Sequence, residues 1–366
     1  MMKKILAGMM LMALLLSGCS KQPNPGELTQ PPQTPSAAPT TDATGEPTPD
    51  LSVYSPTTGL ALKEGAVYKP IAVMIENAPA ARPQTGLQQA DIIYETCVES
   101  SATRMMCIFN DEYPVVAGPM RSVRIYFINI QREWDSPLVH FGGPSNEEKP
   151  VSYVYGKNAE HIKVRVDGVK GKWEKYFWRS SDRKAPHNAY TNVQRIYDEL
   201  YNYEPQYNGP FAFNANVSYD SGAAFSKVGL SFQTDNPEHT EFKYDADSGK
   251  LMRYVNGKEF MVRTVTKDST GKEHTETSQF HATNLIVQYA KEYIIPNDYS
   301  GRRMVEVVGS GKCDYFVAGR HITGTWERKS LDEPTRYYLS NGSPLVLRPG
   351  NTWVAIQPDD GKVAIS

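Results

Sequence analysis

The N-terminal residues 1–19 show the order of charges and apolar side chains that is typical of export signals. Two lysines precede an apolar run, Ile5–Leu16, and two small residues separate this run from Cys19. A positive region, a short apolar region and a small-residue cleavage site together make a secretory signal peptide. A membrane-spanning helix is disfavoured, because spanning a bilayer takes about 20 apolar residues and this run is shorter. We therefore expect residues 1–18 to be removed and to take no part in the fold.

Cys19 directly follows the small residues, and this arrangement resembles the acylation site of a bacterial lipobox. The resemblance implies that Cys19 is lipidated and becomes the first residue of the mature chain. Residues 20–50 contain eight prolines and almost no large apolar side chain. Such a segment buries too little surface to fold, and its prolines keep it extended. We expect residues 19–52 to tether the protein to the outer face of the cell membrane.

Composition limits the function of the part that remains. The formal net charge of −2 gives no electrostatic argument for binding nucleic acid. Cys97, Cys107 and Cys313 form no CxxC pair, so neither a zinc ribbon nor a thioredoxin motif is present, and we expect no metal site and no cofactor. Cys97 and Cys107 end two apolar runs, which leaves both a cross-strand disulfide and buried thiols open.

The first half of the folded part combines predicted strands and helices. Short runs rich in β-branched and aromatic residues predict strands at 69–75 and 137–141, and a hairpin that pairs 92–98 with 103–109. A short helix of one or two turns is expected at 145–148.

Two longer helices are predicted in the same half. One is expected to begin at Gly118-Pro119, with Pro119 in its first turn, and the other is expected to be capped by Thr191. Their apolar residues recur at helical spacing; these are Val123, Tyr126, Phe127, Ile130 and Trp134 in the first helix and Val193, Ile196, Tyr197 and Leu200 in the second.

Beyond Pro210 helical periodicity nearly disappears, and turn signals such as Asp247-Ser248-Gly249 and Asn256-Gly257 separate alternating segments. The sequence therefore predicts a mixed α/β or α+β fold. Residues 53–220 would form an α/β domain with a mixed sheet and two main helices, and residues 221–366 a mostly antiparallel β domain.

The segment GPMRSVR, residues 118–124, is the first candidate site. Arg121 and Arg124 near a helix N-terminus, with Ser122 between them, favour a carboxylate or phosphate ligand. The alternative is that the arginines form internal salt bridges to Glu95 or Glu99, and the sequence does not decide between the two.

The segment RKAPHNAY, residues 183–190, is the second candidate. Arg183, His187 and Asn188 combine a fixed cation, a titratable ring and an amide in one loop, which suits polar-ligand binding or acid–base chemistry. The alternative is that these side chains only attach the loop to the protein body. His140, at a strand end before Gly142-Gly143, is a third candidate with the same structural alternative.

Several motifs and residues of this chain resemble those of the YerB-like family of lipoproteins from Gram-positive bacteria. They are Ala90–Glu95, Gly118–Arg124, Ala185–Asn188 and Pro349–Trp353, within a match that spans about residues 60–358. The resemblance implies a lipoprotein with an α/β N-terminal part and a β-rich C-terminal part. It implies no reaction and no catalytic residues, because the function of the family is uncharacterised.

Two functions from different classes follow as expectations. In the first, Arg121, Ser122, Arg124, Arg183, His187 and Asn188 bind an anionic envelope component such as a peptidoglycan carboxylate or a teichoic acid phosphate. Four aromatic residues, Trp326, Trp353, Tyr337 and Tyr338, would then stack on sugar or peptide, or else belong to the sheet core.

In the second, the protein is a cell-wall hydrolase or transferase. His187 or His140 would act as general acid or base, Glu95 as its partner, and the arginines would stabilise negative charge. The chain contains no HExxH, GxSxG, Walker or SxxK motif that would specify the reaction.

Overall fold

The computed structural model describes residues 53–63, 66–100, 102–207, 209–232 and 238–366. The predicted signal peptide, Cys19 and the tether lie outside these described residues. All described residues belong to one compact unit. In this part of the chain, no helix combines the length and the apolar character that crossing a membrane requires.

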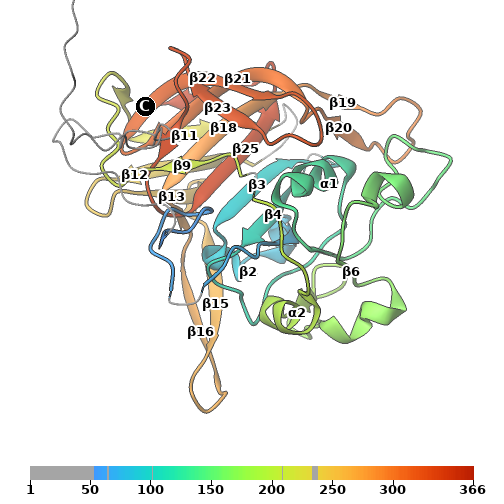
Figure 1. Cartoon of the computed structure of the whole chain (residues 1–366). Helices are drawn as coiled ribbons and strands as arrows, with labels where there is room; N and C mark the ends of the chain where they lie inside the picture. Colours follow the sequence, from blue (N-terminus) through green and yellow to red (C-terminus); the bar gives the residue numbers. More distant parts are fainter. Residues whose placement is uncertain (1–52, 64–65, 101, 208, 233–237) are drawn as a thin grey trace, which may run out of the picture. The chain divides into compact units, whose positions relative to one another are not determined.

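One large mixed sheet runs through the protein and takes strands from both halves of the sequence (Figure 1). Its C-terminal strand β25 lies parallel to β18 on one side and to β3 on the other, so it joins the two halves edge to edge. In spatial order the strands are β10 (Ala223–Ala224), β22 (Arg320–Arg328), β21 (Gly309–Val317), β18 (Asn284–Ala290), β25 (Thr352–Pro358), β3 (Ile92–Cys97), β4 (Thr103–Phe109), β1 (Ile71–Glu76), β5 (Leu138–His140) and β6 (Arg165–Asp167), with β23 (Arg336–Leu339) paired to β22.

The central strands β1, β3 and β4 are buried along their whole length, which explains their nearly continuous apolar sequences. Successive side chains of β1 enter two different cores, one containing Val73 and the other Met74. Helix α1 (Ile125–Gln131) packs into the Met74 core, and helix α2 (Val193–Leu200) into the Val73 core. The two helices therefore cover opposite faces of the sheet.

The rest of the C-terminal half is mostly antiparallel, as predicted. Among the described strands outside the large sheet, parallel pairs occur only between β15 (Met261–Lys267) and β2 (Gln84–Thr85) and between β24 (Val346–Leu347) and β9 (Ala212–Phe213). The turns expected at Asp247-Ser248-Gly249 and Asn256-Gly257 join consecutive strands of a second sheet. Its strands are β14 (Lys258–Glu259), β13 (Lys250–Val255), β12 (Thr240–Asp245), β11 (Lys227–Leu230), β26 (Ala364–Ile365) and β17 (His281–Ala282).

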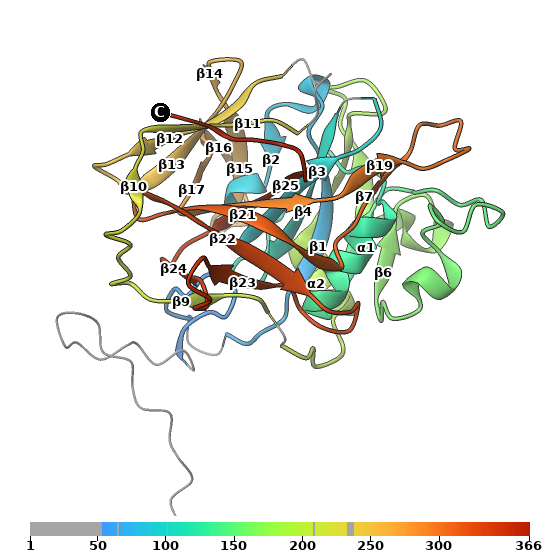
Figure 2. The ribbon, with the colours of Figure 1, turned by 90° about the horizontal axis from the view of Figure 1, so that it is seen from above.

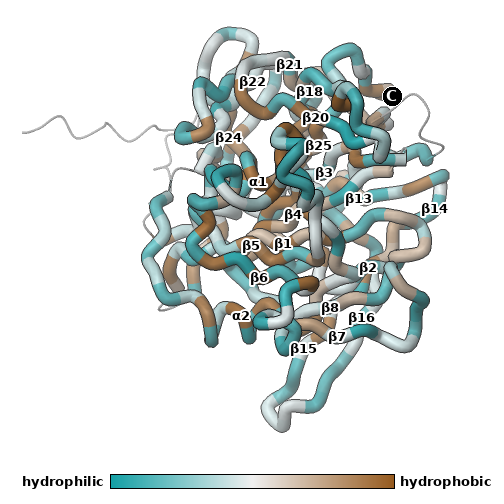
Figure 3. Tube along the Cα trace, turned by 90° about the vertical axis from the view of Figure 1, so that its right-hand side faces the viewer, coloured by the Kyte–Doolittle hydropathy of each residue, from teal (hydrophilic) through white to brown (hydrophobic). Residues whose placement is uncertain are grey.

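A long hairpin, β15 (Met261–Lys267) and β16 (Glu273–Gln279), projects from this half (Figure 1). Its far end is hydrophilic, whereas hydrophobic segments gather around β1, β4 and β5 in the interior (Figure 3). Figure 2 shows the large sheet from above, with α1 beside β1.

The remaining strands are short ribbons and connections. They are β2 (Gln84–Thr85), β7 (Phe177–Arg179), β8 (Ala189–Thr191), β9 (Ala212–Phe213), β19 (Glu292–Ile294), β20 (Arg303–Val305) and β24 (Val346–Leu347). The 3-10 helices are η2 (Pro79–Ala81), η3 (Leu87–Gln89), η4 (Arg132–Trp134), η5 (Gly156–Ala159) and η6 (Gly171–Tyr176).

The predicted fold class is confirmed, but two helix starts and one short predicted helix were wrong. Helix α1 begins at Ile125 and not at Pro119, because residues 118–121 are extended and hydrogen-bond to neighbouring strands. Helix α2 is capped by Asn192, whose side chain accepts a hydrogen bond from the Arg195 amide, and not by Thr191. No helix forms at 145–148.

Both open questions about cysteines and aromatic residues have structural answers. Cys97, Cys107 and Cys313 are buried thiols. In the predicted β3–β4 hairpin, which is confirmed, Cys97 lies opposite Thr103 and Cys107 opposite Ile93, so a disulfide between them is out of register. Three of the four aromatic candidates, Trp326, Trp353 and Tyr337, are buried in the core, and Tyr338 is half-buried. The proposed domain boundary near residue 220 stays a prediction.

Candidate anion-binding site

The two candidate segments of the sequence meet at a third residue, Glu76, at the end of β1. One carboxylate oxygen, Oε1, lies 2.9 Å from Nε of Arg121, and the other, Oε2, lies 3.0 Å from Nδ1 of His187. The Glu76 side chain is only 4% exposed, whereas those of Arg121 and His187 are 28% and 27% exposed. Glu76 thus orients an arginine and a histidine that both reach solvent.

Backbone pairing brings the two segments together. Residues 118–121 lie between the end of β1 and strand β8, because the Glu76 amide donates to Pro119 and the Met120 amide donates to Ala189. Gly118 permits this close approach. Its φ is +151°, and a Cβ atom there would lie 2.7 Å from the Tyr190 ring. Only glycine adopts such a conformation easily.

Two further arginines surround this pair. Arg104, opposite Glu76 in the β1–β4 register, donates from Nη1 to the Ser122 carbonyl at 2.7 Å. Arg124 binds both carboxylate oxygens of Glu99 at 2.6 Å. Burial raises the pKa of Glu99, but the hydrogen bonds and charge of Arg124 outweigh this and hold it below its usual value. The alternative of an internal ion pair therefore holds for Arg124.

We call Arg104, Arg121 and Arg124 the arginine cluster. Arg104 is 7% exposed, its Nε has no hydrogen-bond partner, and no carboxylate lies within 4 Å of it among the described residues. Burial lowers the pKa of Arg104 most, and the neighbouring Arg124 and Arg121 lower it further, while Glu99 opposes them. Arg121 and Arg124 are paired with Glu76 and Glu99, so Arg104 is the member of the cluster without a carboxylate partner among the described residues. A buried cation with an unfilled donor favours an anion as the missing partner.

Arg121 and His187, the partly exposed side chains of the Glu76 contact, carry nitrogens that can bind a ligand. Within the described part of the chain, the Nη atoms of Arg121 and Nε2 of His187 make no hydrogen bond. Ser122 is already engaged, since its hydroxyl donates to the Phe141 carbonyl at 3.0 Å. The free groups therefore suit an oxyanion that accepts from Arg121 and His187 together.

Two predicted ligand-binding residues shape the loop that carries His187. The Arg183 guanidinium donates to the carbonyls of Ala80 and Pro83. The Asn188 amide accepts from Arg179 and donates to two carbonyls of its own loop. These hydrogen bonds attach the loop to the protein body, which was the alternative to ligand binding for Arg183 and Asn188.

His140 does not converge with the site. Its Nδ1 lies 2.8 Å from the Gly142 carbonyl, and Nε2 accepts a hydrogen bond from Arg165 Nε at 2.9 Å. Burial lowers the pKa of His140 to about 4, with the Arg165 charge lowering it further and Asp167 opposing. His140 is therefore neutral at physiological pH, carries its proton on Nδ1, and presents no free nitrogen.

Glu95 is also separate from both histidines. It has no exposed surface and contacts Arg253 at 3.2 Å, and it accepts hydrogen bonds from Asn77 and Thr103. The role of histidine partner, which the sequence favoured for Glu95, falls to Glu76 in the structure. Glu76 was not among the predicted site residues, because the strand was expected to end at Ile75. An acidic residue directly after an apolar run is the sequence feature that could have indicated it.

Comparison with known proteins identifies the family of the chain. One family model, described as "Protein of unknown function (DUF3048) N-terminal domain", matches residues 57–206, and the model for the DUF3048 C-terminal domain matches residues 228–354. The Bacillus subtilis (strain 168) protein named "Putative lipoprotein YerB" is 30% identical over 323 residues, which are 85% of this chain and 88% of the relative. The chain belongs to the DUF3048 family.

A crystal structure of the YerB protein from Bacillus subtilis resembles this DUF3048 protein with a TM-score of 0.65. The two chains are 27% identical, and the match covers 85% of this chain and 99% of the chain in that crystal structure. The resemblance inferred from the sequence motifs is thus confirmed. Two of those motifs, Gly118–Arg124 and Ala185–Asn188, supply the residues that meet at Glu76.

Proposed function

We propose that this DUF3048 protein is a lipid-anchored module on the outer face of the cell membrane, where it binds an anionic component of the envelope. The signal peptide, Cys19 and the proline-rich tether support the anchoring. The name of the relative YerB, which includes the word lipoprotein, supports it independently.

The arginine cluster and His187 form the proposed binding site. One observation carries this proposal: Glu76 fixes Arg121 and His187 with their remaining nitrogens open to solvent, beside the buried Arg104. A peptidoglycan stem peptide would offer a planar carboxylate to these donors, and a teichoic acid would offer a tetrahedral phosphate. Both groups present negatively charged oxygens that a guanidinium binds.

The test uses the purified full-length chain in detergent and washed cell walls. We expect Arg121→Ala to lower several-fold the amount of protein that sediments with walls. Added salt should also lower the amount of wild-type protein that sediments. Arg320→Ala is the matched control, because Arg320 is a partly exposed arginine on β22, towards the opposite end of the main sheet.

Walls stripped of teichoic acids distinguish the two ligands. Binding that persists on stripped walls assigns a peptidoglycan carboxylate, and binding that is lost assigns a teichoic acid phosphate. Equal sedimentation of wild type and Arg121→Ala would contradict the proposed site.

A cell-wall hydrolase or transferase is the second candidate, and the Glu76–His187 contact favours it. A carboxylate that holds Nδ1 of a histidine leaves Nε2 to act as general base or acid, with Arg121 beside it to stabilise negative charge. No serine, threonine or cysteine side chain hydrogen-bonds to His187 within the described residues. Water or a substrate hydroxyl would then be the nucleophile.

The two functions differ in their response to His187→Ala. An enzyme degrades or modifies purified peptidoglycan and loses this turnover in the variant, whereas a binding module shows no turnover in either form. Chromatography of soluble wall fragments measures the difference.

A further inference from the structure

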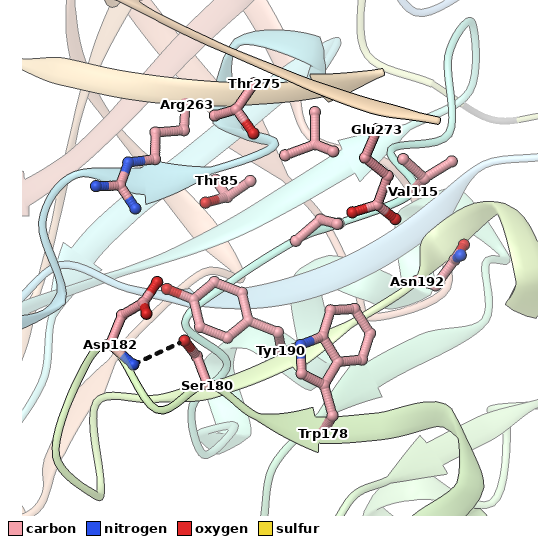
Figure 4. Close-up of a pocket in the computed structure, with 12 residues that line it drawn as sticks. Thr85, Val115, Trp178, Ser180, Asp182, Tyr190, Asn192, Arg263, Glu273 and Thr275 are labelled. Atoms are coloured by element: carbon pink, nitrogen blue, oxygen red, sulfur yellow. Dashed lines mark hydrogen bonds between the residues drawn. The ribbon is translucent and has the colours of Figure 1, made fainter. Parts of the chain in front are cut away.

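A second groove lies between the projecting β15–β16 hairpin and the β7–β8 ribbon, and neither proposed function uses it. Its volume is about 480 Å³, within the range of roughly 300–1,000 Å³ that is typical of ligand pockets. Figure 4 shows Arg263, Thr275 and Glu273 on the hairpin side and Trp178, Tyr190 and Asp182 on the opposite side.

Aromatic rings form one wall of the groove. Trp178 and Tyr190 are direct cross-strand partners, and their rings are nearly parallel, with an angle of 21° and centroids 6.2 Å apart. Tyr190 is buried, but Trp178 is 41% exposed although it is one of the largest apolar side chains. An exposed aromatic platform beside polar groups is characteristic of a surface that stacks on a ligand.

Three charged side chains that line the groove have few protein partners. Among the described residues, Arg263 makes no side-chain hydrogen bond or ion pair, and the carboxylate of Asp182 accepts no hydrogen bond. Glu273 makes only a long contact of 3.6 Å to Lys267 at the exposed surface. Within the described part of the chain, the Arg263 donors and the Asp182 carboxylate therefore face the groove from its two walls without a protein partner.

Strand periodicity explains which hairpin residues face the groove. Arg263 and Val265 are two residues apart on β15, and Thr275 lies opposite Val265, so all three point to the same face of the ribbon. Val262 points to the other face and is completely buried. The hairpin is thus anchored by one face and presents the other to the groove.

We propose that this groove binds an oligosaccharide of β-linked rings with equatorial substituents. Such rings expose flat C–H faces, which pack on the electron-rich face of Trp178, while their hydroxyl or amide groups reach outwards. Asp182 and Glu273 would accept hydrogen bonds from these groups, and Arg263 would donate to their oxygens. This inference does not depend on the anion site at Glu76.

The experiment measures binding of cellohexaose and chitohexaose to the full-length chain in detergent by titration calorimetry and tryptophan fluorescence. At least one of these sugars should bind, and Trp178→Ala should weaken its affinity about tenfold, in line with one lost stacking contact. Arg263→Ala and Asp182→Asn should each weaken it about threefold or more.

Two matched controls keep the result specific. Tyr299→Ala removes an aromatic ring that is 98% exposed and is not among the residues that line the groove, so sugar affinity should not change. Arg121→Ala should leave sugar affinity unchanged, which separates this groove from the anion site. The proposal is overturned if neither sugar binds, if Trp178→Ala binds as tightly as wild type, or if wall peptides displace the sugars from the groove.

Discussion

The guanidinium of Arg253 contacts the carboxylate of Glu95 at 3.2 Å, and neither side chain has any exposed surface. Glu95 lies on β3 of the main sheet and Arg253 on β13 of the second sheet. The rings of Phe260 and Trp353 lie on the guanidinium, each with its centroid 4.2 Å away. This ion pair therefore links the N-terminal and C-terminal halves through the core.

Arg253→Met should destabilise the fold by about 3–5 kcal/mol, because the buried carboxylate of Glu95 loses its charge partner. Urea unfolding measures the change in the free energy of unfolding. The exposed pair Lys291–Glu306 provides the control, and Lys291→Met should change stability by less than about 1 kcal/mol. Similar effects of both substitutions would show that the buried pair is not a structural link.

Gly118→Ala should destabilise the protein by about 1–3 kcal/mol and weaken wall binding, because the new methyl group collides with Tyr190 at a positive φ that disfavours alanine. Gly171→Ala is the control, since nothing lies within 4 Å of its Cβ position, and it should stay within about 0.5 kcal/mol. Thermal unfolding and wall sedimentation of both variants provide the comparison.

His140 should make stability fall as the solution becomes acidic. The pKa of histidine in the unfolded chain is about 6.5, and burial lowers that of folded His140 to about 4. Between these values the unfolded state binds more protons, so the free energy of unfolding decreases as the pH drops through this range, by up to about 3 kcal/mol.

His140→Gln should remove this part of the pH dependence. Other buried groups titrate in the same range, so the informative quantity is the difference between wild type and variant, measured by urea unfolding at pH 7 and pH 4.5. Parallel stability curves for the two proteins would show that His140 does not titrate as expected.

Cys97, Cys107 and Cys313 should resist alkylation in the folded protein and react after unfolding. They are buried, and burial raises the pKa of Cys107, which disfavours the reactive thiolate. Mass spectrometry after iodoacetamide treatment counts the modified residues. A melting temperature that drops on addition of a reducing agent would instead indicate a disulfide.

Cys19→Ala should release the protein into the medium or leave it with its signal peptide. The variant lacks the thiol that the proposed lipid would modify. Cell fractionation and the mass of the N-terminal peptide report the outcome. A variant that has lost its signal peptide but still fractionates with membranes, or a wild-type peptide without a diacylglyceryl group, would exclude the lipid anchor.

The strands of the β3–β4 hairpin and the mostly antiparallel character of the second half could be predicted because each rests on a local pattern. Apolar runs, alternation and turn residues act within a few positions of one another. The start of α1 could not be predicted, because pairing of residues 118–121 with β1 and β8 overrides the helical tendency that Pro119 indicates.

For the candidate site, the sequence by itself determined which segments are rich in cations and titratable groups, namely 118–124 and 183–190. Only the tertiary structure decided that Arg121 and His187 share Glu76, that Arg104 stands beside them, and that Glu95 and His140 are buried elsewhere. The physical reason is that ion pairs form across strands far apart in the chain. A residue's partner is therefore set by sheet register and burial, neither of which is encoded in its immediate neighbours.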